Sequence, residues 1–236
     1  RGGIRTKIGK WILSRATKVI AVSNSNRNEI IKNTSLPLSK IKLIYNSVDL
    51  TVSQDNSKKN QVITIGELNA ETYLRKGIDH FIEVAKLMPE FKFIHVGKWT
   101  DSKGNPSNQC IDLVNELAPS NVRFVGYIEK TTLDSLLSES KVYMQLSRHE
   151  AFGVSAVEAM SYGCIPIISN EYALPEIIGE FGLIIKDINY DIIADKIIKL
   201  FMDKSIQSNN VNKIELFLER YSFSKRKSAF KSLLGC

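Results

Sequence analysis

Two glutamates, Glu150 and Glu158, lie eight positions apart in the stretch RHEAFGVSAVEAM, residues 148–160, which is otherwise mostly small and apolar. The run from Val154 onward predicts a helix, whose first N–H groups would lack intrahelical partners and carry the positive end of the helix dipole. Such a helix start suits a phosphate. Gly153, directly before it, would let a ligand approach the backbone closely.

Two carboxylates beside an anion site are poorly suited to holding the phosphate itself. They are suited to accepting hydrogen bonds from sugar hydroxyls on either side of it. Either glutamate alone is explained as a surface acid near a helix N-terminus. Because both occur with the loop and Gly153, a binding role is favoured. A glycoside hydrolase with Glu150 and Glu158 as acid and base is an alternative, but it gives the helix start no role.

A second stretch, YLRKGIDHFIEVAKLM, residues 73–88, follows the same logic. We expect the loop after Ile65 and Gly66 to deliver Arg75 and Lys76, followed by a glycine and an amphipathic helix. Cations at the end of a strand could neutralise a diphosphate. The alternative, a solvated pair at a turn, explains Arg75 better than it explains Lys76.

Short β-branched apolar runs alternate with helix-length segments along the chain. The predicted strands are 19–22, 42–44, 62–65, 91–96, 122–125, 142–146, 165–168 and 183–185, and the predicted helices include 77–88, 107–118, 131–139, 154–163 and 190–202. This alternation predicts an α/β fold, with a Rossmann-like parallel sheet and helices on both faces. Ligands bind beyond the carboxyl ends of such strands, where both stretches described above are expected.

The polar stretch TVSQDNSKKNQ, residues 51–61, reads as a linker. It separates an opening unit, residues 1–50, from a Rossmann-like domain at 62–204, and the tail at 205–236 is expected to form helices that pack back toward the N-terminal side. The opening unit is too short to build its own core. We interpret it as the closing end of a domain that is mostly missing from this chain.

Composition excludes several classes of protein. No apolar run approaches the roughly 18 residues needed to span a bilayer, and nothing in the 236 residues resembles a signal peptide. The three cysteines are widely spaced and form no C-x-x-C pair. A disulfide framework or zinc site is therefore not expected, and a reducing cytosol is.

The formal net charge of +7 belongs to the first segment of the chain. Residues 1–28 contain seven basic and no acidic residues, so the remaining 25 basic residues balance the 25 acids. Ile4, Ile8, Trp11 and Ile12 share one helical face there, which favours docking on an anionic membrane surface. Packing of that face on the chain's own domain is the alternative. Nucleic acid is not an expected partner, because no basic stripe with interleaved aromatics continues into the body.

The stretch RHEAFGVSAVEAM resembles the E-x7-E motif of the retaining family-4 glycosyltransferases (glycosyl transferases group 1), which have the GT-B fold. VIAVSNSNRNEI, RKGIDHFIEVAKL, AMSYGCIPIIS and ALPEIIGEFGLII resemble further blocks of that family in the expected order. The resemblance implies the C-terminal, donor-binding half of an enzyme that transfers a sugar, with retention, from a nucleotide-sugar to a glycan or lipid-linked acceptor. It implies a role in surface polysaccharide or glycolipid assembly at the inner membrane face.

The resemblance also implies roles for individual residues. Glu150 and Lys76 would be catalytic: Glu150 would contact hydroxyls of the transferred sugar, and Lys76 would contact the phosphates. The other implied donor contacts are Arg75 and the amides of Phe152, Gly153 and Val154 at the sugar and diphosphate, and Glu158, Tyr127 and Ile128 at the nucleoside. No metal and no cofactor are expected, since the fold is habitually metal-independent and the chain has no D-x-D motif.

One departure from the family concerns Glu67, which stands where the family usually has Arg or Lys. A phosphate contact is therefore lost or supplied by Arg75. Catalytic groups of the missing half cannot be assigned to this chain. A non-catalytic nucleotide-sugar-binding subunit that needs a partner domain is consequently the main alternative. A dinucleotide oxidoreductase is disfavoured, because no G-x-G-x-x-G follows any predicted strand.

Overall fold

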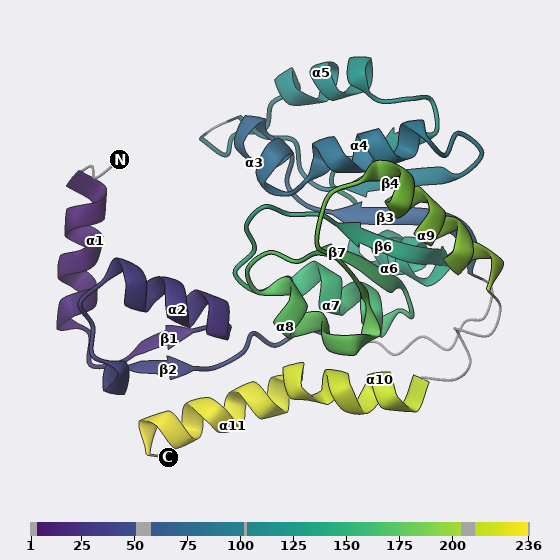
Figure 1. The fold of residues 1–236 in the computed structure, drawn as a ribbon. Coiled ribbons are helices and arrows are strands. Elements are labelled where there is room, and N and C mark those ends of the chain that lie inside the picture. Colours follow the sequence, from purple (N-terminus) through teal and green to yellow (C-terminus); the bar gives the residue numbers. More distant parts are fainter. Residues whose placement is uncertain (1–3, 51–57, 102, 204–210, 236) are drawn as a thin grey trace.

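The computed structural model describes residues 4–50, 58–101, 103–203 and 211–235 (Figure 1). A six-stranded parallel sheet has the order β5-β4-β3-β6-β7-β8, and β1 and β2 form a separate parallel pair. The strands are β1 Val19–Ala21, β2 Ile41–Leu43, β3 Lys59–Ile65, β4 Lys92–Val96, β5 Val122–Phe124, β6 Ser140–Gln145, β7 Ile165–Ser169 and β8 Leu183–Ile185. The predicted α/β class is confirmed.

Helices connect the strands and cover the sheet. They are α1 Ile4–Arg15, α2 Asn24–Asn33, α3 Ala70–Arg75, α4 Ile78–Lys86, α5 Gln109–Leu117, α6 Lys130–Glu139, α7 Val154–Ser161, α8 Leu174–Ile178, α9 Tyr190–Met202, α10 Val211–Leu218 and α11 Phe223–Leu234, with 3₁₀ turns at Leu38–Lys40, Gly179–Phe181 and Glu219–Tyr221. Every predicted strand is found, with ends shifted by up to three residues.

Two sequence predictions need correction. Strand β3 begins at Lys59, inside the predicted linker 51–61. Residues 51–57 of that linker lie outside the described residues. The segment expected to be a loop before Lys76 contains helix α3. Its N-cap is a reciprocal capping box, in which the Asn69 side chain accepts from the Thr72 amide and the Thr72 hydroxyl bonds back to the Asn69 backbone.

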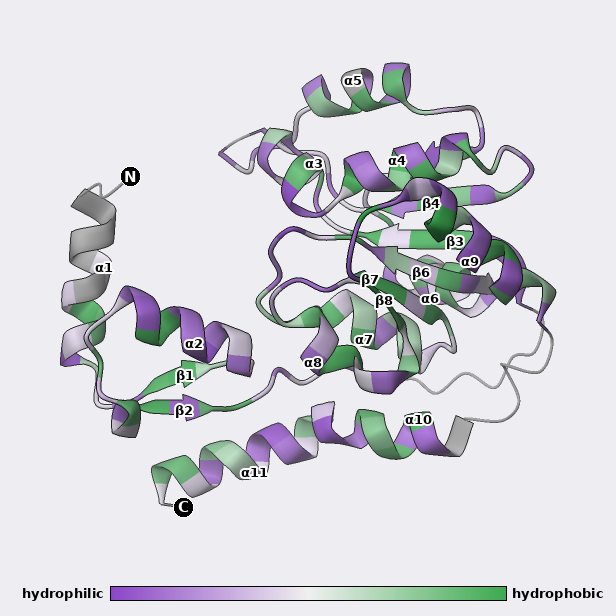
Figure 2. Cartoon of the chain, in the orientation of Figure 1, coloured by the Kyte–Doolittle hydropathy of each residue, from purple (hydrophilic) through white to green (hydrophobic). Residues whose placement is uncertain are grey.

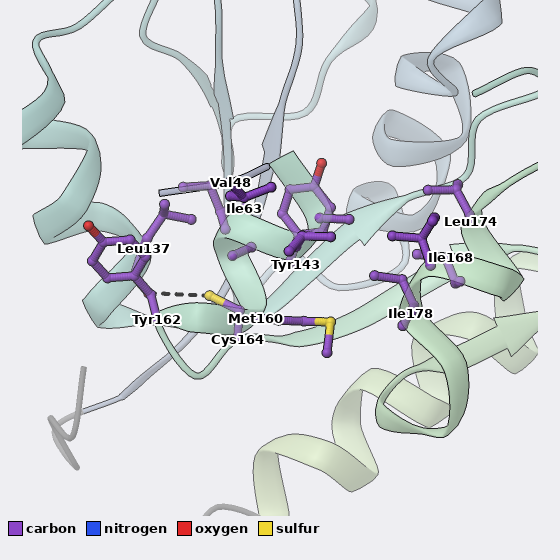
Figure 3. Close-up of a cluster of buried hydrophobic side chains, with 14 of the residues drawn as sticks. Val48, Ile63, Leu137, Tyr143, Met160, Tyr162, Cys164, Ile168, Leu174 and Ile178 are labelled. Atoms are coloured by element: carbon purple, nitrogen blue, oxygen red, sulfur yellow. Dashed lines mark hydrogen bonds between the residues drawn. The ribbon is translucent and has the colours of Figure 1, made fainter. Parts of the chain in front are cut away.

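The sheet is buried on both faces. One core cluster joins strand residues such as Ile63 and Tyr143 to helices α6, α7 and α8, and Figure 3 shows part of it. A second cluster joins Val62 and Met144 to α4 and α9 on the opposite face. Neighbouring residues of one strand point to opposite faces. The middle residues of the central strands β3 and β6 are therefore mainly apolar, whereas the helices mix polar and apolar positions (Figure 2).

The C-terminal helices contact both parts of the chain. Helix α10 lies beside α7, and the Val48 amide donates to the Tyr221 carbonyl at 2.9 Å. The ring of Tyr45 lies 6.2 Å from that of Phe152 and 5.6 Å from that of Tyr221. Helix α11 then extends beside β2 (Figure 1). These contacts agree with tail helices that return to the N-terminal side, while the division into domains stays a prediction.

Helix α1 does not bury the apolar face that the sequence predicts, as far as its described side chains show. Trp11 and Ile12 are 58% and 57% exposed. The Arg15 guanidinium lies 3.9 Å from the centre of the Trp11 ring. Within the described parts of the chain, no helix combines the length and apolar character needed to cross a membrane.

His95 is a completely buried histidine in the middle of the sheet. Its ring lies 5.2 Å from the ring of Phe124. Burial lowers the pKa of His95 to about 4, because an imidazolium would lose its hydration there. Folded His95 is therefore neutral at pH values at which an unfolded histidine is protonated.

This burial predicts acid sensitivity. Between about pH 6.5 and pH 4 the unfolded chain binds one more proton at His95 than the folded chain does. The free energy of unfolding therefore decreases as the pH is lowered through that window. Urea unfolding at pH 7.5 and pH 5 should differ by about 2 kcal/mol from this residue. His95→Leu or His95→Gln should remove that share of the difference. A variant that folds and keeps the full pH dependence would contradict the assignment.

Candidate functional site

The candidate site lies at the carboxyl ends of β3 and β6. Strand β3 pairs in parallel with both β4 and β6, and from there the chain runs outward toward β5 on one side and β8 on the other. The loops that follow β3 and β6 are thereby brought together. This reversal of strand order is where open parallel sheets bind ligands.

An ion pair joins these two loops. Lys76 Nζ lies 2.5 Å from Glu150 Oε2, and the two side chains are only 19% and 14% exposed. The Gln145 side-chain amide donates to the same Glu150 oxygen at 2.9 Å. The structure thus brings together the two residues predicted to be catalytic, which are far apart in the chain. The direction of the Glu150 carboxylate is fixed by these two donors.

Gln145 and Tyr143, on β6, were missed by the sequence analysis. Both side chains are buried, and the Tyr143 hydroxyl donates to Gln145 Oε1 at 2.9 Å. Burial raises the pKa of Tyr143, so its hydroxyl stays a donor. The available signal was a glutamine within an otherwise apolar strand, because a buried amide needs partners. Tyr143 thus orients Gln145, and Gln145 in turn binds Glu150.

Gly77 fixes the distance between the two loops. It has φ +72° at the start of α4, and a Cβ there would lie 2.2 Å from the Leu146 carbonyl oxygen. Beside this contact, the Arg148 amide donates to the Arg75 carbonyl at 2.9 Å. The backbone that carries Lys76 therefore rests directly on the backbone that leads to Glu150.

Gly153, Phe152 and Val154 form the start of α7, as predicted. Gly153 is the N-cap with φ +98°, and a Cβ there would lie 2.7 Å from Leu174 Cδ2 and 3.8 Å from Glu150 Cγ. The Phe152 side chain is buried against Tyr221, with ring centres 5.4 Å apart. The Phe152 side chain is therefore unavailable to a ligand, and the use of its amide stays a prediction.

Lys130 connects Glu158 to the segment that carries the other two predicted nucleoside residues. Glu158 lies one turn into that helix, and its side chain is 17% exposed. Lys130 Nζ lies 3.1 Å from Glu158 Oε1, and Lys130 opens α6 directly after the loop that carries Tyr127 and Ile128. Tyr127 is 64% exposed with Lys98 Nζ 5.4 Å from its ring centre. Sequence reasoning missed Lys130.

A hollow of about 1010 Å³ adjoins Tyr127. Its lining includes Lys98, Trp99, Thr100, Asn108 and Gly126. Aromatic and polar groups together suit a flat heteroaromatic ring. As for metals, the described residues contain no group of three or more histidine, cysteine, aspartate or glutamate side chains placed to hold an ion.

Arg75 does not join the cluster around Lys76 and Glu150. It is the last residue of α3, and its Nε lies 3.3 Å from the Glu71 carboxylate. Glu67 accepts a hydrogen bond from the Thr100 hydroxyl at 2.5 Å. The structure therefore gives no contact by which Arg75 replaces the cation that the family usually has at position 67, and its phosphate role stays a prediction.

The loop between β6 and α7 is tied down on both sides. Arg148 makes a two-pronged ion pair with Asp79 on α4, at 2.9 and 2.6 Å, and these bonds raise the pKa of Arg148. His149 Nε2 lies 3.3 Å from Glu29 of α2, and the Ser23 hydroxyl donates to the Ala151 carbonyl at 2.8 Å. Both parts of the chain thus position Glu150.

Glu176 on α8 makes the strongest connection to the opening segment. Its carboxylate accepts from the Asn24 backbone amide at 2.9 Å and from the Asn24 side chain at 2.9 Å. It also accepts from the Tyr45 hydroxyl at 2.9 Å. A carboxylate at the N-terminus of α2 is favoured by the helix dipole. Burial first, and Glu176 second, raise the pKa of Tyr45 to about 12.

Comparison with known proteins gives consistent matches. The family model described as glycosyl transferases group 1 matches residues 49–215, and that described as glycosyltransferase family 4 matches residues 1–52. A protein of the cps region of Klebsiella pneumoniae, itself uncharacterized, is 26% identical over 217 residues, covering 86% of this chain and 56% of the relative. The O-antigen chain mannosyltransferase B of Escherichia coli is 25% identical over 208 residues, covering 82% of this chain and 54% of that enzyme.

Among solved structures, that of Anabaena HepE in complex with UDP-glucose superposes with a TM-score of 0.80 at 17% identity. The match covers 98% of this chain and 67% of HepE. At this identity the likeness shows the fold alone, and it supports the predicted GT-B class. The chain spans about half the length of the curated relatives it matches.

Gly153 generates a stability prediction. Gly153→Ala should be strained by the positive φ and by crowding against Leu174, and it should lower the free energy of unfolding by about 2–4 kcal/mol in urea titrations. Gly104→Ala is the matched control, because Gly104 has φ +86° but no atom within 4 Å of a built Cβ. It should cost only about 1–2 kcal/mol. Equal losses would show that the packing against Leu174 is unimportant.

Proposed function

Because the chain belongs to the glycosyl transferases group 1 family, we propose that it is the donor-binding half of an enzyme that transfers a sugar from a nucleotide-sugar to a glycan or lipid-linked acceptor. One observation carries the proposal: Lys76 and Glu150 meet at the start of α7, and Glu158 lies one turn further on. A cation, a helix N-terminus and two separated carboxylates match a diphosphate with a sugar at each end.

The donor would lie along the first turns of α7. Its diphosphate faces the Lys76 ammonium and the amides at Gly153 and Val154. Glu150 accepts from hydroxyls of the transferred sugar, and Glu158 accepts from the ribose. The base occupies the region beside Tyr127 and Ile128. The solved complex of HepE with UDP-glucose shows a protein of this fold with such a donor.

In the reaction, the bond between the anomeric carbon and the diphosphate oxygen breaks while the acceptor oxygen forms a bond to that carbon. Retention requires the acceptor to approach from the side on which the diphosphate leaves. The acceptor proton then passes to the departing phosphate oxygen. Negative charge grows on the nucleoside diphosphate, and Lys76 and the helix amides stabilise it without a resident metal ion.

Glu150 pairs with Lys76 at 2.5 Å. An ammonium has three donors, so Lys76 can keep one bond to Glu150 and give others to the phosphates. Glu150 in turn holds Lys76 in place before the donor arrives. Such preorganisation lowers the cost of ordering the side chain during binding.

We propose that the acceptor is presented at the cytoplasmic face of a membrane, in surface polysaccharide or glycolipid synthesis. The basic helix α1, with Trp11 and Ile12 exposed, supports an anionic surface as a partner. The similarity to an O-antigen chain mannosyltransferase supports this class of product.

The donor site is tested by titrating the chain with UDP, GDP and ADP in a calorimeter. We expect one nucleotide to bind, and Lys76→Met and Glu158→Gln each to weaken it about tenfold or more, since each removes a charged hydrogen-bond partner. Lys86→Met and Glu83→Gln are matched controls, because this ion pair of α4 is exposed and remote. Binding that none of these variants changes would place the nucleotide elsewhere.

The reaction is tested in a protein that also contains the acceptor-binding half. The anomeric configuration of the product, read by NMR, should match that of the donor, and a chelator should leave the rate unchanged. An inverted product would refute the retaining mechanism, and loss of rate with the chelator would refute independence from metal.

Membrane docking predicts that the chain sediments with vesicles that contain phosphatidylglycerol at low salt, and less so at high salt. Replacing Trp11 and Ile12 with serine should weaken this binding several-fold. Leu216→Ser is the control, since Leu216 is 73% exposed on α10. Equal binding to neutral vesicles, or no effect of the α1 substitutions, would contradict the proposed surface.

A further inference from the structure

Lys130, the first residue of α6, makes a three-way contact. Its Nζ bonds to Asp134 Oδ1, lies 3.1 Å from Glu158 Oε1, and bonds to the Tyr162 hydroxyl at 3.3 Å. An ammonium group has three N–H donors. The three oxygens around Lys130 therefore match its full capacity, and it is occupied as a structural clamp rather than available as a ligand-binding cation.

The clamp is charged and reaches Glu158 from the solvent side. The Lys130 side chain is 46% exposed, whereas that of Glu158 is 17% exposed. Partial burial alone would lower the pKa of Lys130, but the bonds to Asp134, Glu158 and Tyr162 raise it above its usual value. Lys130 is thus protonated at any physiological pH.

Lys130 fixes one oxygen of Glu158, because its Nζ contacts Oε1. A glutamate has several rotatable bonds, and ordering them on ligand binding costs free energy. With Oε1 fixed, Oε2 keeps a defined direction and can accept from a hydroxyl of a bound ligand.

Removing the ammonium would do more than release this oxygen. Asp134 also bonds to Lys130, so two carboxylates would face each other across the vacated position. The negative charges of Asp134 and Glu158 would then repel each other. Glu158 would move away from Asp134 and away from the direction that it now has.

We propose that Lys130 is a positioning residue that orients Glu158 so that the donor site selects ribose over 2′-deoxyribose. This rests on the proposed function, in which Glu158 accepts the ribose hydroxyls. Lys130 itself touches no part of the donor. Its effect is therefore confined to the sugar of the nucleoside and does not extend to the phosphates or the base.

The experiment measures a ratio. The chain is titrated with UDP, GDP and ADP, and with the 2′-deoxy form of each. The wild-type chain should prefer the ribose form of its nucleotide by about tenfold, the effect of one hydrogen bond to a charged group. Lys130→Met should bring this ratio close to one, mainly by weakening the ribose form.

Two further variants separate positioning from general damage. Lys130→Arg keeps the charge and several donors, so it should restore most of the preference. Lys59→Met removes a comparable ion pair, Lys59 Nζ to Glu139 Oε2 at 2.7 Å, at the other end of α6. It should leave the ratio unchanged.

The outcomes are distinguishable. If Lys130→Met weakens ribose and deoxyribose forms equally, or leaves the ratio intact while Glu158→Gln abolishes it, the role of Lys130 is overturned and the donor site stands. If the wild-type chain binds none of these nucleotides, or binds them without preference and without any effect of Glu158→Gln, the proposed function of this site fails as well.

Discussion

The parallel pairing of β3 with β6 is the constraint on which the site depends. It joins segments about eighty residues apart in the chain, with Val62 opposite Val142 and Ile63 opposite Tyr143. Everything at the carboxyl edge follows from this register. The backbone of Gly77 then lies against the backbone of Leu146. This main-chain contact sets how far the segment that carries Lys76 lies from the segment that leads to Glu150.

Above this base, charges are arranged in pairs. Lys76 with Glu150 and Lys130 with Glu158 place a cation beside each carboxylate of the E-x7-E motif. A partly buried carboxylate without such a partner would be costly. The two cations therefore offset the repulsion between the two carboxylates and an anionic diphosphate. Each acid also retains an oxygen that can accept from a sugar hydroxyl.

The strands were predictable because buried parallel strands contain a continuous apolar run. The start of β3 was missed because Lys59, Asn60 and Gln61 are polar residues at the N-terminal end of that strand. Helix α3 was missed because six residues carry almost no periodic signal. Its capping pair, Asn69 and Thr72, was the one local indication of a helix start.

The individual site residues were recognisable from their stretches, but their contacts were not. Spacing along the chain does not reveal that β3 and β6 are neighbours, and so it could not predict that Lys76 meets Glu150. The role of Lys130 was missed for the same reason, since Glu158 lies on another helix. The expected phosphate contact of Arg75 had less support than that of Lys76, because a cation at a strand end has many possible partners. In the structure Arg75 contacts Glu71.

Glu176 has a practical consequence for anyone who trims this protein. The linker near residue 51 invites a cut that would keep only the larger sheet. That cut would remove the helix start at Asn24 and the Tyr45 hydroxyl, so the donors to the Glu176 carboxylate would be lost. It would also strip the Tyr45 ring from Phe152, whose backbone opens α7. A shortened chain would therefore expose an apolar surface directly beneath the site that it was meant to isolate.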